Sequence, residues 1–227
     1  MKDIDHTCKN AFNWDTVMRA LPHSYVRLKA KDVLPLTSRC DEVGCVISGV
    51  LLTTAIDDYG RQKALWLAGA HHLYMQEPTD FYFTVKALTD ASILWTGRRL
   101  FTELLQSDAT LLDQYLADSS QNLNNQITHL LRSQEYSGRA RLYDFLIQLT
   151  TTYGRPENEK NDSIWLLPNI FPREDLASLA GIHQSNCSRY LTELRRARIM
   201  IKHAHDDACI NLPALRQILN KELTRKK

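Results

Sequence analysis

The stretch GIHQSNCSRYLTELRRARI, residues 181–199, combines side chains that form hydrogen bonds with side chains that only pack. Its apolar positions recur three, one and three residues apart, so they share one helical stripe: Cys187, Tyr190, Leu191 and Leu194. Polar side chains fall on the other side: Gln184, Ser185, Ser188, Arg189 and Thr192. We call Gln184, Ser185, Ser188 and Arg189 the recognition face, because amide, hydroxyl and guanidinium groups can read base edges.

A helix-turn-helix is predicted to carry this face. Pro172 suits the first position of a helix, where its missing N–H would have no partner. Ala177 lets a second helix approach closely, and Gly181 permits a left-handed turn between the two. The inner packing positions are Leu176, Ala180, Ile182, Cys187, Tyr190 and Leu194. We therefore expect the recognition face near the N-terminal half of the second helix, which enters the major groove in this motif.

The preceding part of the chain predicts the elements that support the motif. GCVISGVLLTTAI and RQKALWLAGA are β-rich runs joined by the turn DDYG, DFYFTVKALTDASILW adds two strands, and YVRLKAKDVLPL fits the same arrangement. These short strands predict an antiparallel barrel or roll, and we expect a β-roll of the jelly-roll or double-stranded β-helix type over residues 1–107. The expected fold class is α+β.

A long helix free of Gly and Pro is expected from Asp108 to about Glu135 within a segment 108–136, after a short helix in RRLFTELLQ. Positions four and three residues apart form a heptad seam: Leu112, Leu116, Ser119, Leu123, Gln126 and Leu130. Polar residues at Ser119 and Gln126 favour an interface between two chains of fixed register over packing within one domain. The helix is therefore interpreted as a dimerisation helix of a homodimer.

Residues 137–227 are predicted to form a winged helix-turn-helix domain. A helix restarts after a break at residues 136–138, RPENEKNDS is expected as a polar loop, IWLLP as a strand, and IKHAHDDACINL as two short strands. From Pro168 onward Lys and Arg exceed Asp and Glu by five, whereas the first 167 residues carry an excess of three negative charges. This bias suits a polyanion partner, although basic ends such as LTRKK are often merely solvated.

At these residues the chain resembles the Crp/Fnr family of bacterial transcription regulators. The part similar to the family's recognition motif is REDLASLAGIHQSNCSRYLTEL, and the parts similar to its sensor roll are GVLLTTAIDDYGRQKALWLAGA and TVKALTDASILW. The resemblance covers the whole chain and implies a two-fold dimer that reads a near-palindromic site in double-stranded DNA, with RNA polymerase as a further partner. It implies base contacts by Gln184, Ser185 and Arg189 with Ser188 beside them, and phosphate contacts by His183 and Asn186. Arg195 and the other arginines of RRAR are also expected at phosphates. Many members have an acidic residue at the place of Ser185, so the familiar half-site sequence is not carried over.

Alternatives remain open at single positions of the recognition face. Arg189 can donate two hydrogen bonds to guanine O6 and N7, or it can pair with Glu193 on the surface. Gln184 can contact an adenine or a phosphate. Ser185 and Ser188 can be solvated helix residues.

The roll lacks the residues that the resemblance associates with cyclic nucleotides. Members that bind them carry Gly-Glu followed by Arg-Ser/Thr-Ala, and here the arginine position falls near Phe83, with Thr84 after it. A cyclic phosphate without its guanidinium would be left unpaired in a buried pocket. Cyclic AMP and GMP are therefore not expected, whereas a different small-molecule effector remains possible.

The five cysteines are scattered and do not indicate a disulfide framework. Cys8 stands alone, so the clustered N-terminal thiolates that an iron–sulfur centre needs are missing. Cys40 and Cys45 could form a redox pair, but Cys45 occupies a strand position suited to a small apolar side chain. Cys187 is expected in the core.

The histidines give weak signals for metal or haem. Adjacent residues in a strand point to opposite faces, so His71 and His72 are interpreted as ordinary surface histidines. His203, His205 and Cys209 could approach one zinc ion, but no fourth ligand is evident. No metal site and no cofactor is expected.

Motifs for catalysis, secretion or membrane insertion are not found in the sequence. It contains no nucleophile elbow, phosphate-binding glycine loop or HExxH, and no apolar window of membrane-spanning length. We expect a cytoplasmic protein that is not an enzyme and has no membrane partner. The competing interpretation is a small-ligand-binding or redox-sensing module that regulates protein partners without specific DNA binding.

Overall fold

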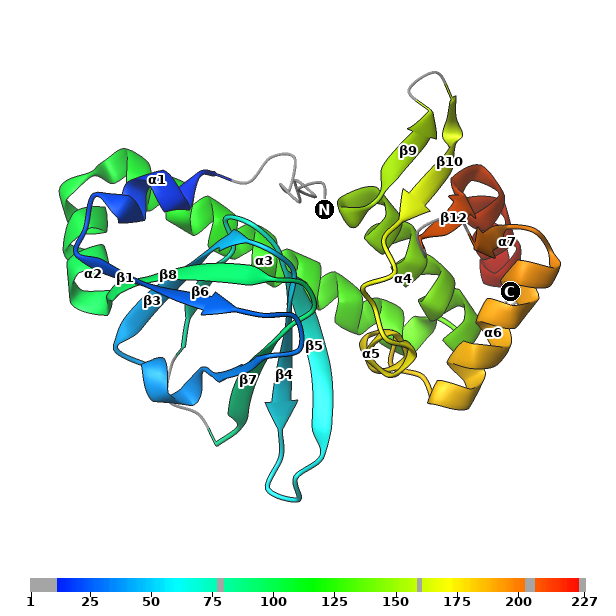
Figure 1. Cartoon of the computed structure of the whole chain (residues 1–227), viewed down its shortest axis with the longest axis horizontal. Coiled ribbons are helices and arrows are strands. Elements are labelled where there is room, and N and C mark those ends of the chain that lie inside the picture. Colours follow the sequence, from blue (N-terminus) through cyan, green and yellow to red (C-terminus); the bar gives the residue numbers. More distant parts are fainter. Residues whose placement is uncertain (1–11, 77–79, 159–160, 203–206, 225–227) are drawn as a thin grey trace. The chain divides into compact units, whose positions relative to one another are not determined.

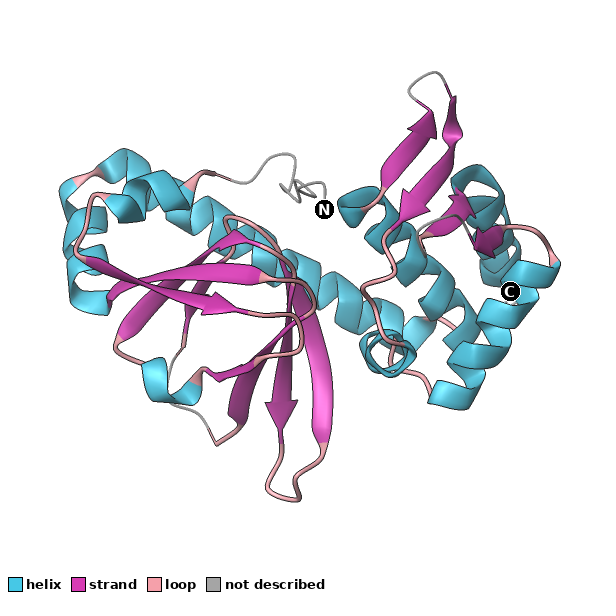
Figure 2. Cartoon of the chain, in the orientation of Figure 1, coloured by secondary structure: helices cyan, strands magenta, loops and turns pink. Residues whose placement is uncertain are grey.

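The computed structural model describes residues 12–76, 80–158, 161–202 and 207–224, and the chain divides into two compact units (Figure 1). The first unit spans Met1–Gln126 and the second spans Ile127–Lys227. The helix α3 (Ala109–Glu135) begins in the first unit and ends in the second. Both units combine helices with antiparallel sheets, which confirms the predicted α+β class (Figure 2).

The first unit is a β-roll of eight strands: β1 (His23–Leu28), β2 (Val33–Pro35), β3 (Glu42–Ser48), β4 (Leu51–Ile56), β5 (Gln62–Ala68), β6 (Leu73–Met75), β7 (Tyr82–Ala87) and β8 (Ala91–Gly97). They form two four-stranded sheets in the orders β1-β8-β3-β6 and β2-β7-β4-β5, and every pairing is antiparallel. A 3₁₀ turn, η1 (Thr37–Arg39), follows β2. The predicted hairpin around DDYG is present, because β4 pairs with β5 across it.

The core of the roll lies between the two sheets because alternate residues of each strand turn inward. On β7 the inward residues are Phe83, Val85 and Ala87. The opposite sheet contributes Ile93 and Trp95 from β8 to the same cluster.

The outer face of the β1-β8-β3-β6 sheet is covered by helices: α1 (Trp14–Arg19), α2 (Arg98–Ser107) and the start of α3. Trp14 makes edge-to-face contacts with Phe101 and Tyr115 at centroid distances of 5.8 Å and 6.2 Å. The Trp14 indole also donates a hydrogen bond of 2.7 Å to Asp118 of α3. The first turns of α3 are thereby fixed to the roll, whereas α1 has no counterpart among the predicted elements.

The second unit has a four-stranded sheet and four further helices: α4 (Gly138–Tyr153), β9 (Arg155–Asn158), β10 (Asn161–Leu167), α5 (Arg173–Leu179), α6 (Gln184–Arg196), β11 (Met200–Lys202), β12 (Ala208–Asn211) and α7 (Leu212–Thr224). The strand order is β11-β12-β10-β9. The predicted helix break is present, with Ser137 capping α4 by accepting a hydrogen bond from the Ala140 N–H.

Two features of this unit differ from the sequence predictions. RPENEKNDS was expected as a polar loop, but its first four residues form β9 and pair with β10. These residues are exposed, so the ladder of backbone hydrogen bonds forms without the apolar alternation that identifies a strand in a sequence. The helix α7 was not predicted; it buries Leu215 and Leu219.

Candidate nucleic-acid interface

The turn between α5 and α6 is built as the motif predicts, with one correction at its start. Pro172 is the N-cap residue of α5 and not its first helical residue, since its ψ of 147° is extended. The Pro172 carbonyl still accepts a hydrogen bond of 3.0 Å from the Leu176 N–H. Proline has no N–H, so it adds no unpaired donor to the start of the helix. The correction moves the helix start by one residue.

Gly181 has the left-handed conformation expected of it, with a φ of +62°. Its amide donates to the Ser178 carbonyl, and the next amide, of Ile182, donates to the Ala177 carbonyl at 2.9 Å. A Cβ at position 181 would only touch Arg141 at an ordinary 3.6 Å, so the backbone conformation, and not crowding, explains the glycine. Ala177 is buried, as close helix contact requires.

His183 begins α6 as its N-cap residue. Its Nδ1 accepts a hydrogen bond from the Ser185 N–H at 3.3 Å and lies 2.8 Å from the Ser185 hydroxyl. The helix N-terminus is therefore capped by a side chain predicted to contact phosphate, and Ser185 is held at the first turn.

The helix α6 separates its two faces as the sequence pattern predicts. Cys187, Leu191 and Leu194 are at most 2% exposed. Of the recognition face, Gln184, Ser185 and Arg189 are exposed and Ser188 is half-buried. The four side chains thus lie on one exposed side of a helix whose other side is fixed in the core.

The structure gives Arg189 contacts that the sequence did not suggest. Its Nη2 donates to the Asn186 Oδ1 at 3.1 Å and to the Tyr190 hydroxyl at 3.3 Å, and its Cζ lies 5.0 Å from the Tyr190 ring centroid. The alternative partner, Glu193, forms a 3.1 Å ion pair with Arg139 of α4. Sequence reasoning missed Arg139, because its partners lie in distant parts of the chain.

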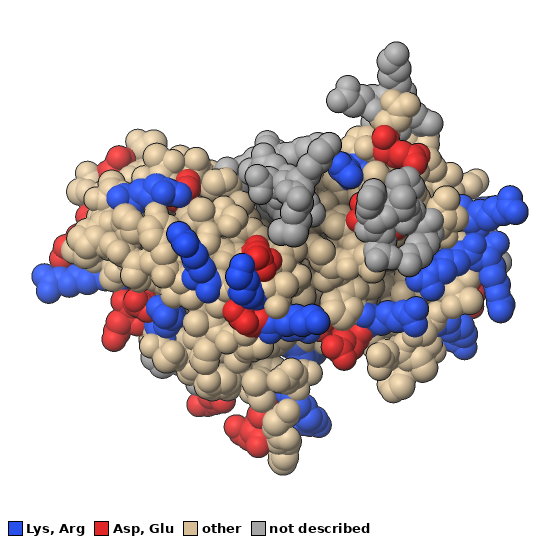
Figure 3. Space-filling view, in the orientation of Figure 1, with Lys and Arg blue, Asp and Glu red and all other residues tan. Residues whose placement is uncertain are grey.

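Positive charge continues beyond the recognition face. Arg195 and Arg196 end α6, Arg198 follows with a φ of 56°, and all three are exposed. Figure 3 shows Lys and Arg side chains gathered at the part of the second unit that carries α6. This surface suits a polyanion.

The predicted dimer seam on α3 is exposed within a single chain. Leu112, Leu116, Leu123 and Leu130 are 37%, 53%, 59% and 56% exposed. Every residue from Ser119 to Leu131 is exposed, so more than three helical turns present most of their side-chain surface to solvent in the single chain.

At the place of the cyclic-nucleotide arginine, the roll has an apolar side chain. Phe83 lies on β7 and packs against the core between the sheets. The next residue, Thr84, is buried and shares a 2.7 Å hydrogen bond with Thr54. No cationic side chain occupies either position.

Cys45 and Cys187 are buried thiols whose pKa values are raised. Burial raises the pKa of the Cys45 thiol to about 12, and this residue lies on β3 in the packed layer beneath the helices. The Cys40 thiol is half-buried and donates to the Thr37 carbonyl at 3.2 Å. Cys187 is fully buried, as predicted, and burial raises its pKa. A thiol held in its protonated form is a poor redox nucleophile.

The interpretation of His71 and His72 as strand residues on the surface is wrong. They form a turn before β6, in which His71 has a φ of +68° and a buried Nδ1, and both are half-buried. Burial lowers the pKa of His72 to about 4, and its ring lies 5.0 Å from Tyr74. The chain makes a tight turn here, and the sequence around the two histidines has no apolar pattern that would have predicted it.

Most of the remaining metal candidates cannot be placed within the described residues. His203, His205 and Cys8 lie outside the described residues, and Cys209 is 3% exposed. Within the described ranges, no group of three or more His, Cys, Asp or Glu residues is arranged to hold a metal ion.

Comparison with known proteins identifies the fold. No protein-family model matches the chain, and no curated protein matches it in sequence. Among solved structures, a CooA mutant from Carboxydothermus hydrogenoformans is 17% identical, with a TM-score of 0.71 over 94% of this chain and 97% of that chain. FixK2 from Bradyrhizobium japonicum is 15% identical, with a TM-score of 0.70 over 87% and 97%. TTHA1359, a CRP/FNR-family transcriptional regulator from Thermus thermophilus, is 21% identical, with a TM-score of 0.65 over 88% and 100%.

The chain therefore has the fold of CRP/FNR transcription regulators, as the sequence resemblance predicted: a β-roll, a long helix and a winged helix-turn-helix. None of the helices in the described ranges is both long enough and apolar enough to cross a membrane.

Proposed function

We propose that this protein is a dimeric, sequence-specific regulator of transcription that binds double-stranded DNA. The observation that carries the proposal is the recognition face, exposed on a 13-residue helix whose opposite side is buried. Gln184, Ser185, Ser188 and Arg189 would contact base edges in the major groove. The CRP/FNR fold supports this assignment by analogy only.

Residues around the recognition face are suited to hold the DNA backbone. Asn186 uses its Oδ1 to accept from Arg189, so its amide NH₂ remains to donate to a phosphate. His183 uses Nδ1 at the helix cap, which turns the other ring nitrogen into its available donor. The positive end of the α6 dipole lies at the same place, and Arg195 adds charge at the far end of the helix.

Dimerisation through α3 would place two recognition helices on one duplex. The exposed leucines of the seam support this role, because such a row of apolar side chains is unfavourable in water unless another surface covers it. The polar seam positions Ser119 and Gln126 are also exposed and would specify the register. A two-fold dimer would read a near-palindromic site.

The proposed regulator works without a cyclic nucleotide and acts in the cytoplasm with RNA polymerase as its further partner. The apolar position of Phe83 supports the first part, because no cation there would offset a cyclic phosphate. A different small-molecule effector of the roll is compatible with these contacts.

Sequencing the genomic DNA fragments that the purified protein retains, with and without cell extract, tests the proposal. The expected result is two inverted half-sites with centres about one helical turn, or roughly 10 bp, apart. Retention of fragments without a shared sequence would contradict it.

Arg189→Ala is expected to cost on the order of 1–3 kcal/mol on the selected site and little on random DNA, because a base contact is lost. Equilibrium titration of both DNAs measures the ratio of their affinities. Arg216→Ala removes an exposed charge of the same unit outside α6 and should leave that ratio unchanged. Equal losses on both DNAs for Arg189→Ala would contradict a base contact by Arg189. Sequence specificity would then come from the wing or from DNA shape.

A further inference from the structure

The surroundings of Arg189 assign a role to two residues that do not belong to the recognition face. We infer that Tyr190 and Arg139 hold the Arg189 guanidinium in position before DNA arrives, and that they thereby set sequence specificity as positioning residues. The inference rests on the proposed function and deepens it.

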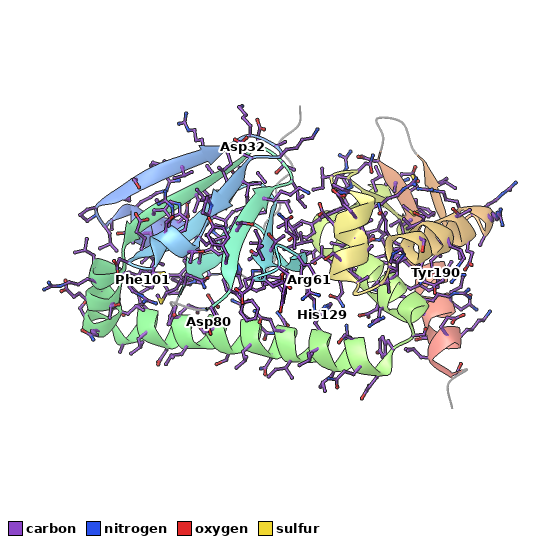
Figure 4. The ribbon with its side chains drawn as sticks, turned by 90° about the horizontal axis from the view of Figure 1, so that it is seen from below. Asp32, Arg61, Asp80, Phe101, His129 and Tyr190 are labelled. Carbon is purple, nitrogen blue, oxygen red and sulfur yellow. The ribbon has the colours of Figure 1, made fainter. Side chains whose placement is uncertain are left out.

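The Tyr190 ring contacts two guanidinium groups. The Cζ of Arg189 lies 5.0 Å from the ring centroid and the Cζ of Arg139 lies 5.2 Å from it, both within the range of a cation–π contact. The Tyr190 hydroxyl also accepts a hydrogen bond from Arg189. Tyr190, labelled in Figure 4, is half-buried on α6, so the ring itself is fixed by its surroundings.

Arg139 is anchored by carboxylates from two other helices. Its Nη2 pairs with Glu193 of α6 at 3.1 Å and its Nη1 with Glu222 of α7 at 3.3 Å. The Arg139 side chain is only 33% exposed, which strengthens both pairs relative to pairs in open solvent. Two cations on one ring would repel each other, and the two carboxylates offset this repulsion.

Arg189 is held on a second side by Asn186, whose Oδ1 accepts from the same Nη2 atom that approaches Tyr190. Among the described residues, its Nε and Nη1 have no hydrogen-bond acceptor, so each can donate one bond to a base, whereas a two-bond contact with guanine also engages Nη2. A flexible arginine loses side-chain freedom when it binds, and a guanidinium already held on a ring loses less. This saving in side-chain entropy favours only DNA that places an acceptor where the held guanidinium points. It therefore raises the ratio of specific to random affinity.

Variants of Tyr190 test the inference on the site that the wild type selects and on random DNA. Tyr190→Leu keeps an apolar side chain but removes the ring, and we expect it to lower the ratio of specific to random affinity by about tenfold. Tyr190→Phe keeps the ring and loses only the hydroxyl, so a loss of about threefold or less is expected. Arg139→Ala should fall between the two.

The same variants in an Arg189→Ala background separate positioning from a general structural role. If Tyr190 and Arg139 act through Arg189, Tyr190→Leu should not lower the ratio further once Arg189 is absent. An equal drop in both backgrounds would overturn the inference. Thermal unfolding of each variant identifies any that is not folded, and if Tyr190→Leu is not folded, Arg139→Ala carries the comparison.

A measurement without DNA distinguishes failure of the inference from failure of the proposed function. In the full-length protein with labelled arginine, the NMR signals of the Arg189 side chain, assigned through Arg189→Ala, should lose their ring-current shift and become more mobile in Tyr190→Leu. Unchanged Arg189 signals would overturn the inference. A wild type that selects no sequence would refute the proposed function and the specificity role with it, whereas a selective wild type with an unchanged ratio in Tyr190→Leu refutes the inference alone.

Discussion

The β-roll and the winged-helix unit place their polar side chains differently. In the roll, Thr53 bonds to the Tyr74 hydroxyl at 3.1 Å and Thr54 bonds to Thr84, and all four residues are buried. In the winged-helix unit, three polar residues of the recognition face are exposed on α6: Gln184, Ser185 and Arg189. Two buried hydroxyl groups that bond to each other cannot bind a ligand, whereas exposed polar side chains can form hydrogen bonds with one.

This difference indicates which unit can bind a polyanion as it stands. The roll also buries the ring nitrogens of Trp66, Trp95 and His71, for which the described residues provide no acceptor or donor. Such groups lower stability when they remain unpaired. The winged-helix unit also has one such atom among its described residues, Nε of Arg141, but its Tyr190 ring contacts the guanidinium of the exposed Arg189. The predictions below test this contrast.

The largest effect is expected from charge on the seam of α3. Leu116→Glu combined with Leu123→Glu should separate the dimer and lower specific DNA affinity by about 100-fold or more, because the second half-site no longer binds intramolecularly. Both side chains are more than half exposed, so the fold of the single chain should persist. Sedimentation equilibrium and DNA titration measure the two effects.

The matched control places two glutamates on the opposite side of the same helix, at Gln121 and Thr128, both exposed. That variant should remain a dimer with unchanged DNA affinity. A wild type that sediments as a monomer would end the seam hypothesis.

The next largest effect concerns the stability of the roll as the pH falls. Burial lowers the pKa of His72 to about 4, whereas the unfolded chain takes up this proton near pH 6.5. The stability that the neutral ring provides is fully present above about pH 6.5 and is lost as the pH falls toward 4. The loss should reach about 2 kcal/mol, because partial solvent contact reduces it below the full value of the shift.

Urea unfolding of the wild type and of His72→Phe between pH 7.5 and 4.5 measures the contribution of His72 to the pH dependence of stability, since the other titrating groups are common to both proteins. The difference in free energy of unfolding should change with pH in favour of His72→Phe. A difference that stays constant with pH would show that His72 is not protected from protonation.

A smaller effect is expected at the far end of α6. Arg195 is exposed, so Arg195→Ala should weaken binding to specific and random DNA alike and reduce the salt dependence by about one unit of slope. Affinities measured over a range of salt concentrations give the slope. A loss confined to the specific site would mean that Arg195 reads a base.

The smallest expected effect is none at all. Cyclic AMP should release no heat on titration into the protein, because Phe83 fills the position where a guanidinium would pair with the phosphate. Micromolar binding in calorimetry would show that another residue pairs with the phosphate and that the roll is open to anions.

Much of the fold could be predicted from the sequence because it depends on local periodicity. The β-rich runs on either side of the turn DDYG predicted the strands there, and the absence of Gly and Pro predicted α3. The sided pattern of residues 184–194 predicted both the buried stripe and the exposed recognition face. The turn at Gly181 was predictable because few residues other than glycine adopt a positive φ easily.

Elements without such a pattern were missed or misinterpreted. The exposed strand β9 has no apolar alternation that would identify it in the sequence. The segment at His71 and His72 follows a strand and was interpreted as part of one, because the positive φ of His71 that makes it a turn is not visible in the sequence. Their structure depends on pairing with β10 and on the reversal of the chain before β6.

What the sequence by itself determined is which side chains share a face, because neighbours along a helix or strand are set by its repeat. Only the tertiary structure decided which distant residues meet. Arg139 finds Glu193 at a separation of 54 residues and Glu222 at 83, and Trp14 finds Asp118 at 104. Such contacts form when packing of the cores brings remote elements together, and no local pattern encodes them. The recognition face could therefore be predicted, whereas the Tyr190 and Arg139 support beneath Arg189 could not.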